Sequence, residues 1–221
     1  PETMIVTGTR HQFPEDAGPM AHPVRPASYI EINNFYTMTV YEKGAEVVRM
    51  QANLLGPERF RTATDLYFER HDGQAVTTED FLRCMADSAG EDLSQMQHWY
   101  DYAGTPTVSA TGVYDGDEAT YTLTLEQSTP DTPGQADKPP FLIPVTTALV
   151  GASGEELPVS LGPAAAPAAE HTLRFVADRQ QFVFHGVNEE PVPSLLRGFS
   201  APVKLDLELS DQQLTFLMRH D

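Results

Sequence analysis

The stretch Glu31-Ile-Asn-Asn-Phe-Tyr36-Thr-Met-Thr-Val-Tyr41-Glu-Lys-Gly-Ala45 leads into the first long helical pattern of this chain. From Tyr36 onward, apolar and small residues recur every three or four positions, which is the spacing of one face of an α-helix. These residues are Val40, Gly44, Val47, Val48, Leu54 and Leu55. Gly56 and Pro57 follow directly, and such a pair is typical of a helix end. The sequence therefore predicts a helix from Tyr36 to the Gly56-Pro57 pair.

Three more helices are predicted before Gly104. Pro57 suits the first turn of the second helix, because a proline there loses no helical hydrogen bond, and Gly73 closes that helix. Thr77 and Asp80 have the spacing of a capping box and mark the start of the third helix. A fourth, short helix ends at Gly104. With short connections between them, these helices predict a small helical bundle.

The periodicity changes from helical to alternating after Pro106. Residues 120–127 alternate between apolar and polar, and Asp115-Gly116 before them is a hairpin signal. Other strands are predicted at residues 141–150, 156–161, 171–176, 181–185 and 203–209. The proline-broken segments 128–140 and 163–167 are predicted to be loops. Short strands at this spacing favour a sandwich. The expected fold class is therefore α+β, a small helical bundle followed by an antiparallel β-sandwich.

The composition argues against two classes of partner. The chain has 221 residues, with 14 Lys and Arg against 32 Asp and Glu, and a net charge of −18. It has no basic patch for a phosphate backbone, so we expect no nucleic acid partner. An anionic membrane surface repels such a chain, and no apolar run reaches the length of about 18 residues that a membrane helix needs. We therefore expect a soluble protein with no membrane partner.

The metal-binding and nucleophilic residue types form no recognisable site in the sequence. The chain has seven histidines, but no two lie four apart with Glu after the first, so the zinc-binding pattern His-Glu-x-x-His is absent. His71 and Asp72 are adjacent, and adjacent helical residues point apart, which does not suit a shared metal ion. Cys84 lies among helically spaced apolar residues and is interpreted as a buried, inert thiol. We expect no metal site in this chain.

The opening stretch resembles the tyrosine-bearing helix of the zinc aminopeptidase N family. Further segments resemble the bacterial branch of that family, in the same order, and the resemblance runs from about Phe13 to the C-terminus. They are Tyr67-Phe-Glu-Arg-His-Asp-Gly73, Trp99-Tyr100, Ala103-Gly-Thr-Pro106, Phe199-Ser-Ala-Pro202 and Ser210-Asp-Gln-Gln-Leu-Thr-Phe-Leu-Met-Arg219. Arg25, in the similar loop His22-Pro-Val-Arg-Pro26, is expected to pair with acidic neighbours rather than with substrate.

The resemblance implies four parts of the chain. Residues 13–104 resemble the last, helical part of a thermolysin-like catalytic domain, and residues 105–209 resemble the β-sandwich third domain of the family. Residues 210–221 look like the start of a helical domain that is truncated after a helix cap at Ser210. Residues 1–12 are expected to be an atypical N-terminal segment, since residues 1–10 depart from the charged helical approach of the family.

The resemblance also assigns site residues. Tyr41 matches the catalytic tyrosine whose hydroxyl donates a hydrogen bond to the oxyanion, and a phenol with a pKa of about 10 donates without ionising at neutral pH. Tyr36 matches the tyrosine that lines the pocket for the first side chain of the substrate, and Asn33 is a further candidate for that pocket. The family's amine-binding Gly-x-Met-Glu-Asn segment, its zinc ligands and its general-base Glu have no counterpart here.

The function implied by this resemblance is removal of N-terminal amino acids from peptides by a zinc metallo-aminopeptidase. Zinc would be the cofactor of the complete enzyme, its partners would be peptide substrates and the remaining domains, and its location would be the cytoplasm. The isolated chain is expected to be inactive. A second hypothesis is a non-catalytic β-sandwich binding or structural module, which recognises a partner through exposed strand edges.

Overall fold

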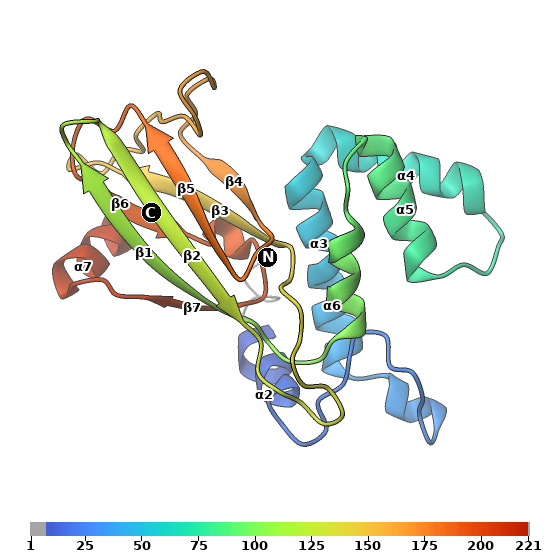
Figure 1. Cartoon of the computed structure of the whole chain (residues 1–221). Coiled ribbons are helices and arrows are strands. Elements are labelled where there is room, and N and C mark those ends of the chain that lie inside the picture. The colour runs from blue at the N-terminus through green and yellow to red at the C-terminus, as the bar shows by residue number, and fades with distance from the viewer. Residues whose placement is uncertain (1–7, 221) are drawn as a thin grey trace. The chain divides into compact units, whose positions relative to one another are not determined.

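The computed structural model describes residues 8–220, and these form two compact units. The helical unit contains the described residues up to Pro106 together with Thr129–Leu142. The β unit contains Thr107–Ser128 and the described residues from Ile143 onward. Residues 1–7 of the predicted atypical segment, and Asp221, lie outside the described residues. Figure 1 labels the helices and strands of both units.

The helical unit is built around three helices, α3 (Gly44–Leu55), α4 (Pro57–His71) and α5 (Thr78–Ala89). α4 and α5 pack side by side (Figure 1). The shorter elements are η1 (Gly8–Gln12), α2 (Phe13–Asp16), η2 (Ile32–Phe35), η3 (Thr39–Lys43), η4 (Ser94–Gln97) and α6 (His98–Asp101). η1 and η3 are π-helical turns, whereas η2 and η4 are 3-10 turns. The helical part of the predicted α+β fold is therefore confirmed.

The boundaries of the long helices follow from a few residues. Gly56 has a φ of 76°, a value that glycine adopts without strain, and it separates α3 from α4. Pro57 begins α4 as predicted. The predicted capping box at α5 is also present. Asp80 Oδ2 accepts the backbone N–H of Thr77 at 3.0 Å and its hydroxyl at 3.1 Å. These local signals were sufficient because each acts within one turn of the chain.

The first long helix begins later than the periodicity predicts. Glu31 and Asn34 cap each other reciprocally, with the Glu31 N–H donating to Asn34 Oδ1 at 3.0 Å, and this closes η2 as a separate turn. Tyr36 then adopts a non-helical backbone, with φ −89° and ψ 73°. Helical structure resumes at Thr39 and continues through η3 into α3.

The core of the helical unit is centred on Trp99, which is fully buried. Its indole N–H donates to the Leu142 carbonyl at 2.8 Å, and its ring contacts Phe141 edge-on at 4.9 Å between centroids. Gln135 bonds to the backbone at both Asp101 and Ala103, at 2.8 Å each. The segment Thr129–Leu142 therefore packs with the helices, although it connects two strands.

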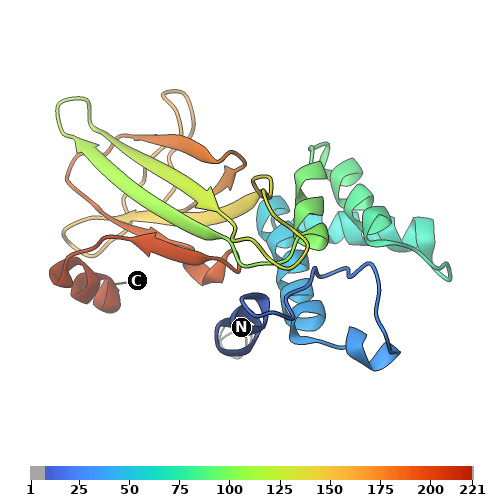
Figure 2. The same cartoon turned by 60° about the horizontal axis from the view of Figure 1, so that its bottom comes forward.

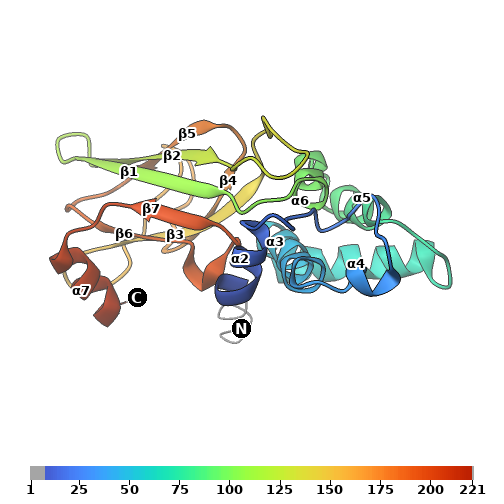
Figure 3. The same ribbon diagram turned by 90° about the horizontal axis from the view of Figure 1, so that it is seen from below.

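The β unit consists of two sheets that form two layers (Figure 3). The strands are β1 (Thr107–Asp115), β2 (Thr120–Ser128), β3 (Ile143–Val150), β4 (His171–Phe175), β5 (Arg179–His185), β6 (Val192–Leu195) and β7 (Lys204–Leu207). One sheet has the order β5-β2-β1-β7 and the other β4-β3-β6. Buried side chains of β2 and β3 include Leu123, Leu125 and Leu149. The sandwich half of the predicted α+β fold is confirmed.

One strand pair departs from the predicted antiparallel arrangement. β7 pairs with β1 in parallel, with Thr107 opposite Lys204, whereas the other strand pairs are antiparallel. β7 follows β6, which belongs to the other sheet. The chain therefore crosses from one sheet to the other before β7 pairs with β1. A crossover of this kind permits parallel pairing, whereas a tight hairpin does not.

Prolines explain two errors in the strand predictions. Residues 156–161 form isolated bridges, such as Val159 with Ala168, and not a strand. Pro158 lies in that segment and has no N–H for a ladder. β6 was not predicted, because Pro193 interrupts its apolar pattern, yet the strand forms at the edge of its sheet. The hairpin at Asp115 is confirmed, and Asp115 Oδ1 accepts two backbone N–H groups of the turn.

The chain ends with α7 (Asp211–His220), which follows β7 (Figure 2). Ser210 caps this helix as predicted, since its Oγ accepts the Gln213 N–H at 3.2 Å and the Gln213 side chain accepts the Ser210 N–H at 2.9 Å. No helix in the described residues is long and apolar enough to cross a membrane. Cys84 is buried, as its helical context predicted.

Candidate functional site

Tyr36 and Tyr41 lie together on the surface of the helical unit. Their rings stack, with centroids 6.2 Å apart and an angle of 25° between the planes. The two side chains are 58% and 59% exposed. Asn33 is exposed in the preceding 3-10 turn, and its carbonyl accepts the Tyr36 N–H at 3.4 Å. The structure thus brings the two predicted tyrosines into contact and links Asn33 to them through the backbone.

The turn that carries Tyr41 is stabilised by local hydrogen bonds. The first N–H groups of a helix have no partner within the helix and need acceptors from elsewhere. The Thr37 hydroxyl accepts the Val40 N–H at 3.2 Å, and the Thr37 carbonyl accepts the Tyr41 N–H at 3.1 Å. Glu15 Oε1 accepts both the N–H of Thr39, at 2.8 Å, and its hydroxyl, at 2.6 Å. A carboxylate from α2 therefore completes the start of the turn.

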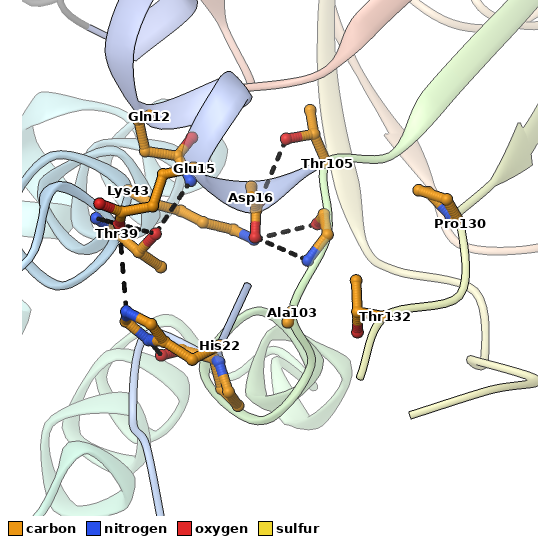
Figure 4. A network of polar contacts seen from close by, with 12 residues as sticks. Gln12, Glu15, Asp16, His22, Thr39, Lys43, Ala103, Thr105, Pro130 and Thr132 are labelled. Atoms are coloured by element: carbon orange, nitrogen blue, oxygen red, sulfur yellow. Dashed lines mark hydrogen bonds and ion pairs between the residues drawn. The ribbon is translucent and has the colours of Figure 1, made fainter. Parts of the chain in front are cut away.

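A buried ion pair lies at the other end of the same turn (Figure 4). Lys43 Nζ is 2.8 Å from Asp16 Oδ2, and the two residues are 1% and 0% exposed. Lys43 also donates to the Gly104 carbonyl at 3.0 Å. Asp16 accepts the Gly104 N–H at 2.7 Å and the Thr105 hydroxyl at 3.1 Å. Every charged atom of the pair therefore has hydrogen-bond partners in the helical unit.

The electrostatics of this pair favour the ionised form of Asp16. Burial by itself raises the pKa of Asp16, but the charge and hydrogen bond of Lys43 and the Gly104 N–H outweigh it, so the pKa is lowered. Lys43 Nζ also lies 5.9 Å from the centroid of the Trp99 ring, within range of a cation–π interaction. Neutralising either partner would leave an uncompensated buried charge.

Arg25 pairs with two carboxylates, as expected. It binds Glu79, and its Nη2 lies 2.6 Å from Asp101 Oδ1. The hydrogen bond from Arg25 lowers the pKa of Glu79 to about 2. The side chain is thus engaged in joining the loop before the tyrosines to α5 and α6.

The described residues do not provide a zinc site. Within residues 8–220, no group of three or more His, Cys, Asp and Glu side chains could hold a metal ion. The His71 ring lies 5.6 Å from the Tyr67 ring, and Asp72 is exposed. The donor set that a zinc enzyme needs is therefore not assembled by the described residues.

The sequence did not identify the residues that hold the tyrosine turn, which are Glu15, Asp16 and Lys43. Glu15 and Asp16 look like ordinary surface charges, and Lys43 was read only as part of the quoted stretch. Lys43 and Asp16 are 27 positions apart, and Asp16 and Gly104 are 88 apart. One signal was available: Lys43 adjoins a helix whose buried face includes Val47 and Met50.

Two family models together match nearly all of the chain. The Peptidase family M1 domain matches residues 1–100, and a domain of unknown function (DUF3458) with an Ig-like fold matches residues 104–208. The first match includes the N-terminal residues that we expected to depart from the family. A match to the M1 peptidase domain, followed by a match to an Ig-like domain, places this chain in the M1 peptidase family.

The relatives narrow the class further. The chain is 51% identical to aminopeptidase N of Escherichia coli (strain K12) over 209 residues, which is 95% of this chain and 24% of that protein. It is 48% identical to aminopeptidase N of Caulobacter vibrioides over 93% of this chain and 23% of that protein. The chain belongs to the M1 aminopeptidase N family, and it spans about a quarter of the length of these curated relatives.

A solved structure supports the same assignment. The crystal structure of Legionella pneumophila aminopeptidase A in complex with aspartic acid aligns with a TM-score of 0.75 and 30% identity. The alignment covers 90% of this chain and 21% of that chain. The alignment therefore extends over both units of this chain.

Proposed function

We propose that this chain supplies Tyr41 as the oxyanion-stabilising residue, and Tyr36 with Asn33 as part of the pocket for the first substrate residue, in a zinc aminopeptidase. The complete enzyme would remove N-terminal amino acids from peptides. The observation that carries this proposal is the exposed, stacked pair of Tyr36 and Tyr41 in a chain of the aminopeptidase N family.

Peptide-bond hydrolysis requires a hydrogen-bond donor for the oxyanion that is neutral, accessible to substrate and held in a fixed position. Hydrolysis of a peptide bond passes through a tetrahedral intermediate, in which negative charge develops on the former carbonyl oxygen. A tyrosine hydroxyl donates a hydrogen bond to that oxygen and remains protonated at neutral pH. Tyr41 is exposed on a turn that is held at one end through the Thr39 N–H, which donates to Glu15, and at the other through the Lys43 side chain, which donates to the Gly104 carbonyl.

Tyr36 and Asn33 suit a recognition role. In this proposal the Tyr36 ring offers an apolar face to a substrate side chain, and its stacking on Tyr41 supports a role close to the proposed oxyanion donor. Asn33 is exposed and adds an amide that can donate or accept. Residues that contact the first side chain affect the choice between substrates more than the chemistry itself.

The remaining machinery would come from residues outside this chain. The described residues assemble no zinc ligand set, so we propose that the zinc ion and the general base belong to other parts of the complete enzyme. The isolated chain is then inactive. Its partners in the complete enzyme are the remaining domains and the peptide substrates.

The test compares substrates with free and blocked amino termini. The complete enzyme is expected to hydrolyse aminoacyl amides and to leave the N-acetylated amides intact. The isolated chain, assayed at the same concentration with added zinc, is expected to hydrolyse neither. Equal cleavage of free and acetylated substrates by the complete enzyme would contradict an aminopeptidase function. Activity of the isolated chain would contradict the proposal that the zinc ion and the general base belong to other parts of the enzyme.

A further inference from the structure

We propose that Glu15 and the Asp16–Lys43 ion pair are positioning residues that fix the turn carrying Tyr41. This proposal rests on the proposed function, because it concerns the placement of the oxyanion donor. Tyr41 remains the catalytic residue, since its hydroxyl would contact the reacting atoms. Glu15, Asp16 and Lys43 would act on the reaction through Tyr41 alone.

The first step of the argument is the environment of the two residues that flank Tyr41. Tyr41 occupies the middle of the five-residue turn η3, with Thr39 two positions before it and Lys43 two positions after it. Thr39 and Lys43 are buried, whereas Tyr41 is largely exposed. The Tyr41 ring stacks on the Tyr36 ring, which is itself largely exposed, so the backbone position of Tyr41 depends on the buried residues on either side.

The second step is that both flanking residues are held by one element. Glu15 Oε1 binds the backbone and hydroxyl of Thr39, and Asp16 binds Lys43 (Figure 4). Glu15 and Asp16 are consecutive residues at the end of α2. The two ends of the tyrosine turn are therefore attached to a single short helix, and a shift of α2 moves both.

The third step is that α2 is itself held in place by hydrogen bonds to the segment around Gly104. Gly104 closes a ring of hydrogen bonds, since its N–H donates to Asp16 Oδ1 and its carbonyl accepts from Lys43 Nζ. Gly104 has a φ of 94°, which favours glycine, and a Cβ there would lie 3.2 Å from Lys138 Nζ. Residues of α2, η3 and the Gly104 segment are thus tied at one point, although they are distant in the sequence.

The fourth step distinguishes positioning from simple stability. A buried ion pair often contributes no more to stability than a well-packed apolar pair of similar size, because desolvation of the charges offsets their attraction. Directional hydrogen bonds do, however, define where the atoms lie. An oxyanion donor must be held within about 0.5 Å of its productive position. The network beneath Tyr41 supplies directional contacts at both ends of its turn.

Glu15 offers the cleanest test, because it is partly exposed and its loss leaves the buried ion pair intact. In the complete enzyme, Glu15→Ala is expected to lower kcat by up to about 100-fold, because a misplacement of about 1 Å at a reacting group costs that much, with little change in KM. Glu15→Gln should restore most of the rate, since its amide oxygen can accept both bonds from Thr39. Glu58→Ala removes a first-turn carboxylate from α4 and serves as the control, expected to keep the normal rate.

A double-mutant cycle shows whether Glu15 acts through Tyr41. If it does, adding Glu15→Ala to Tyr41→Phe causes little further loss of kcat, because the donor is already absent. A loss of the same factor in both backgrounds, or normal kcat in Glu15→Ala, would overturn the proposal. A fall in thermal stability is expected in both backgrounds and does not by itself separate the alternatives.

A spectroscopic measurement tests whether Glu15 positions Tyr41 independently of whether Tyr41 takes part in catalysis. With 3-fluorotyrosine at position 41 of the complete enzyme, the ¹⁹F resonance is expected to shift or broaden in Glu15→Ala and to stay unchanged in Glu58→Ala. If Tyr41→Phe keeps full kcat, the proposed catalytic role fails, and the ¹⁹F result still decides whether Glu15 positions the residue. An unchanged resonance in Glu15→Ala would refute positioning whatever the kinetics show.

Discussion

Tyr36 stacks on Tyr41 across five positions of the chain, with ring centroids 6.2 Å apart. Tyr36 has a non-helical backbone, whereas Tyr41 lies in a π-helical turn. The contact therefore depends on the break between η2 and η3, since a regular helix would place residues five apart at different angles around its axis. The interruption that made the helix begin late is thus what brings the two tyrosines together.

Replacing Tyr36 should change substrate choice more than maximal rate. Tyr36→Ala removes an apolar ring from the proposed pocket, so the ratio of kcat/KM for leucyl over alanyl amides should fall by about tenfold. Tyr36→Phe keeps the ring and should change this ratio less. The measurement is kcat/KM of the complete enzyme on both amides. An unchanged ratio in Tyr36→Ala would remove Tyr36 from the pocket.

The Asp16–Lys43 pair should show strong coupling in stability. Lys43→Met leaves a buried carboxylate without its cation and is expected to cost about 3–5 kcal/mol. The double variant Asp16→Asn/Lys43→Met removes both charges while keeping an acceptor for the Gly104 N–H, and it should be clearly more stable than Lys43→Met alone. Urea unfolding of the three proteins measures the difference. A double variant no more stable than Lys43→Met would show that the charges do not depend on each other.

The same pair predicts a direction for the pH dependence of stability. Folding lowers the pKa of Asp16 below its usual 3.8, so the folded state binds fewer protons at this group than the unfolded state. Its contribution is therefore fully present above pH 3.8 and is lost as the pH falls through the lower, folded value. The free energy of unfolding of the unsubstituted protein should therefore fall relative to that of Asp16→Asn/Lys43→Met in that acidic window. A relative rise on acidification would contradict the assignment.

Gly104 should tolerate alanine poorly. The substitution places a Cβ at a φ of 94°, with Lys138 Nζ at 3.2 Å and the Pro130 carbonyl at 3.3 Å. Backbone strain of this kind costs about 1–2 kcal/mol, and the crowding adds to it. Gly134→Ala is the matched control, because its φ is 77° but no atom lies within 4 Å of the new Cβ. Thermal unfolding should show a larger loss for Gly104→Ala; equal losses would mean that the contacts around Gly104 are unimportant.

Hydrogen exchange should differ between α4 and β3 in the isolated chain. Ala63 is the one buried residue of α4, whereas every residue of β3 is buried. Segments with few buried contacts open locally with a lower free energy. Amides of α4 should therefore exchange at least about tenfold faster than those of β3. Equal protection of the two elements would show that α4 is held by interactions which its exposure does not reveal.

The fold was predictable where the determinants are local. Thr77 and Asp80, or Gly56 and Pro57, act within one turn, so their sequence pattern is enough. The parallel pairing of β7 depends on a crossover between sheets, and no local pattern records it. Likewise, an edge strand that contains Pro193 looks like a loop until its neighbour is known.

The site was predictable only in part for a related reason. Tyr36 and Tyr41 stand in one continuous stretch that resembles a known family, so they could be named together. Asp16 and Lys43 resemble surface charges in the sequence, because burial and pairing are set by contacts between distant segments. Their pairing becomes visible only when the fold brings α2 against η3.

The most direct test of the central claim is the kinetic effect of Tyr41→Phe in the complete enzyme. The substitution removes one hydroxyl and keeps the ring, so loss of an oxyanion donor should lower kcat by about 10²–10³-fold. KM should change little, because the ground-state carbonyl depends less on this hydrogen bond. Tyr29→Phe, at a tyrosine that is 53% exposed outside the stacked pair, is the control and should keep normal kcat. A Tyr41→Phe enzyme with nearly full kcat would contradict the account and leave Tyr41 with no chemical role.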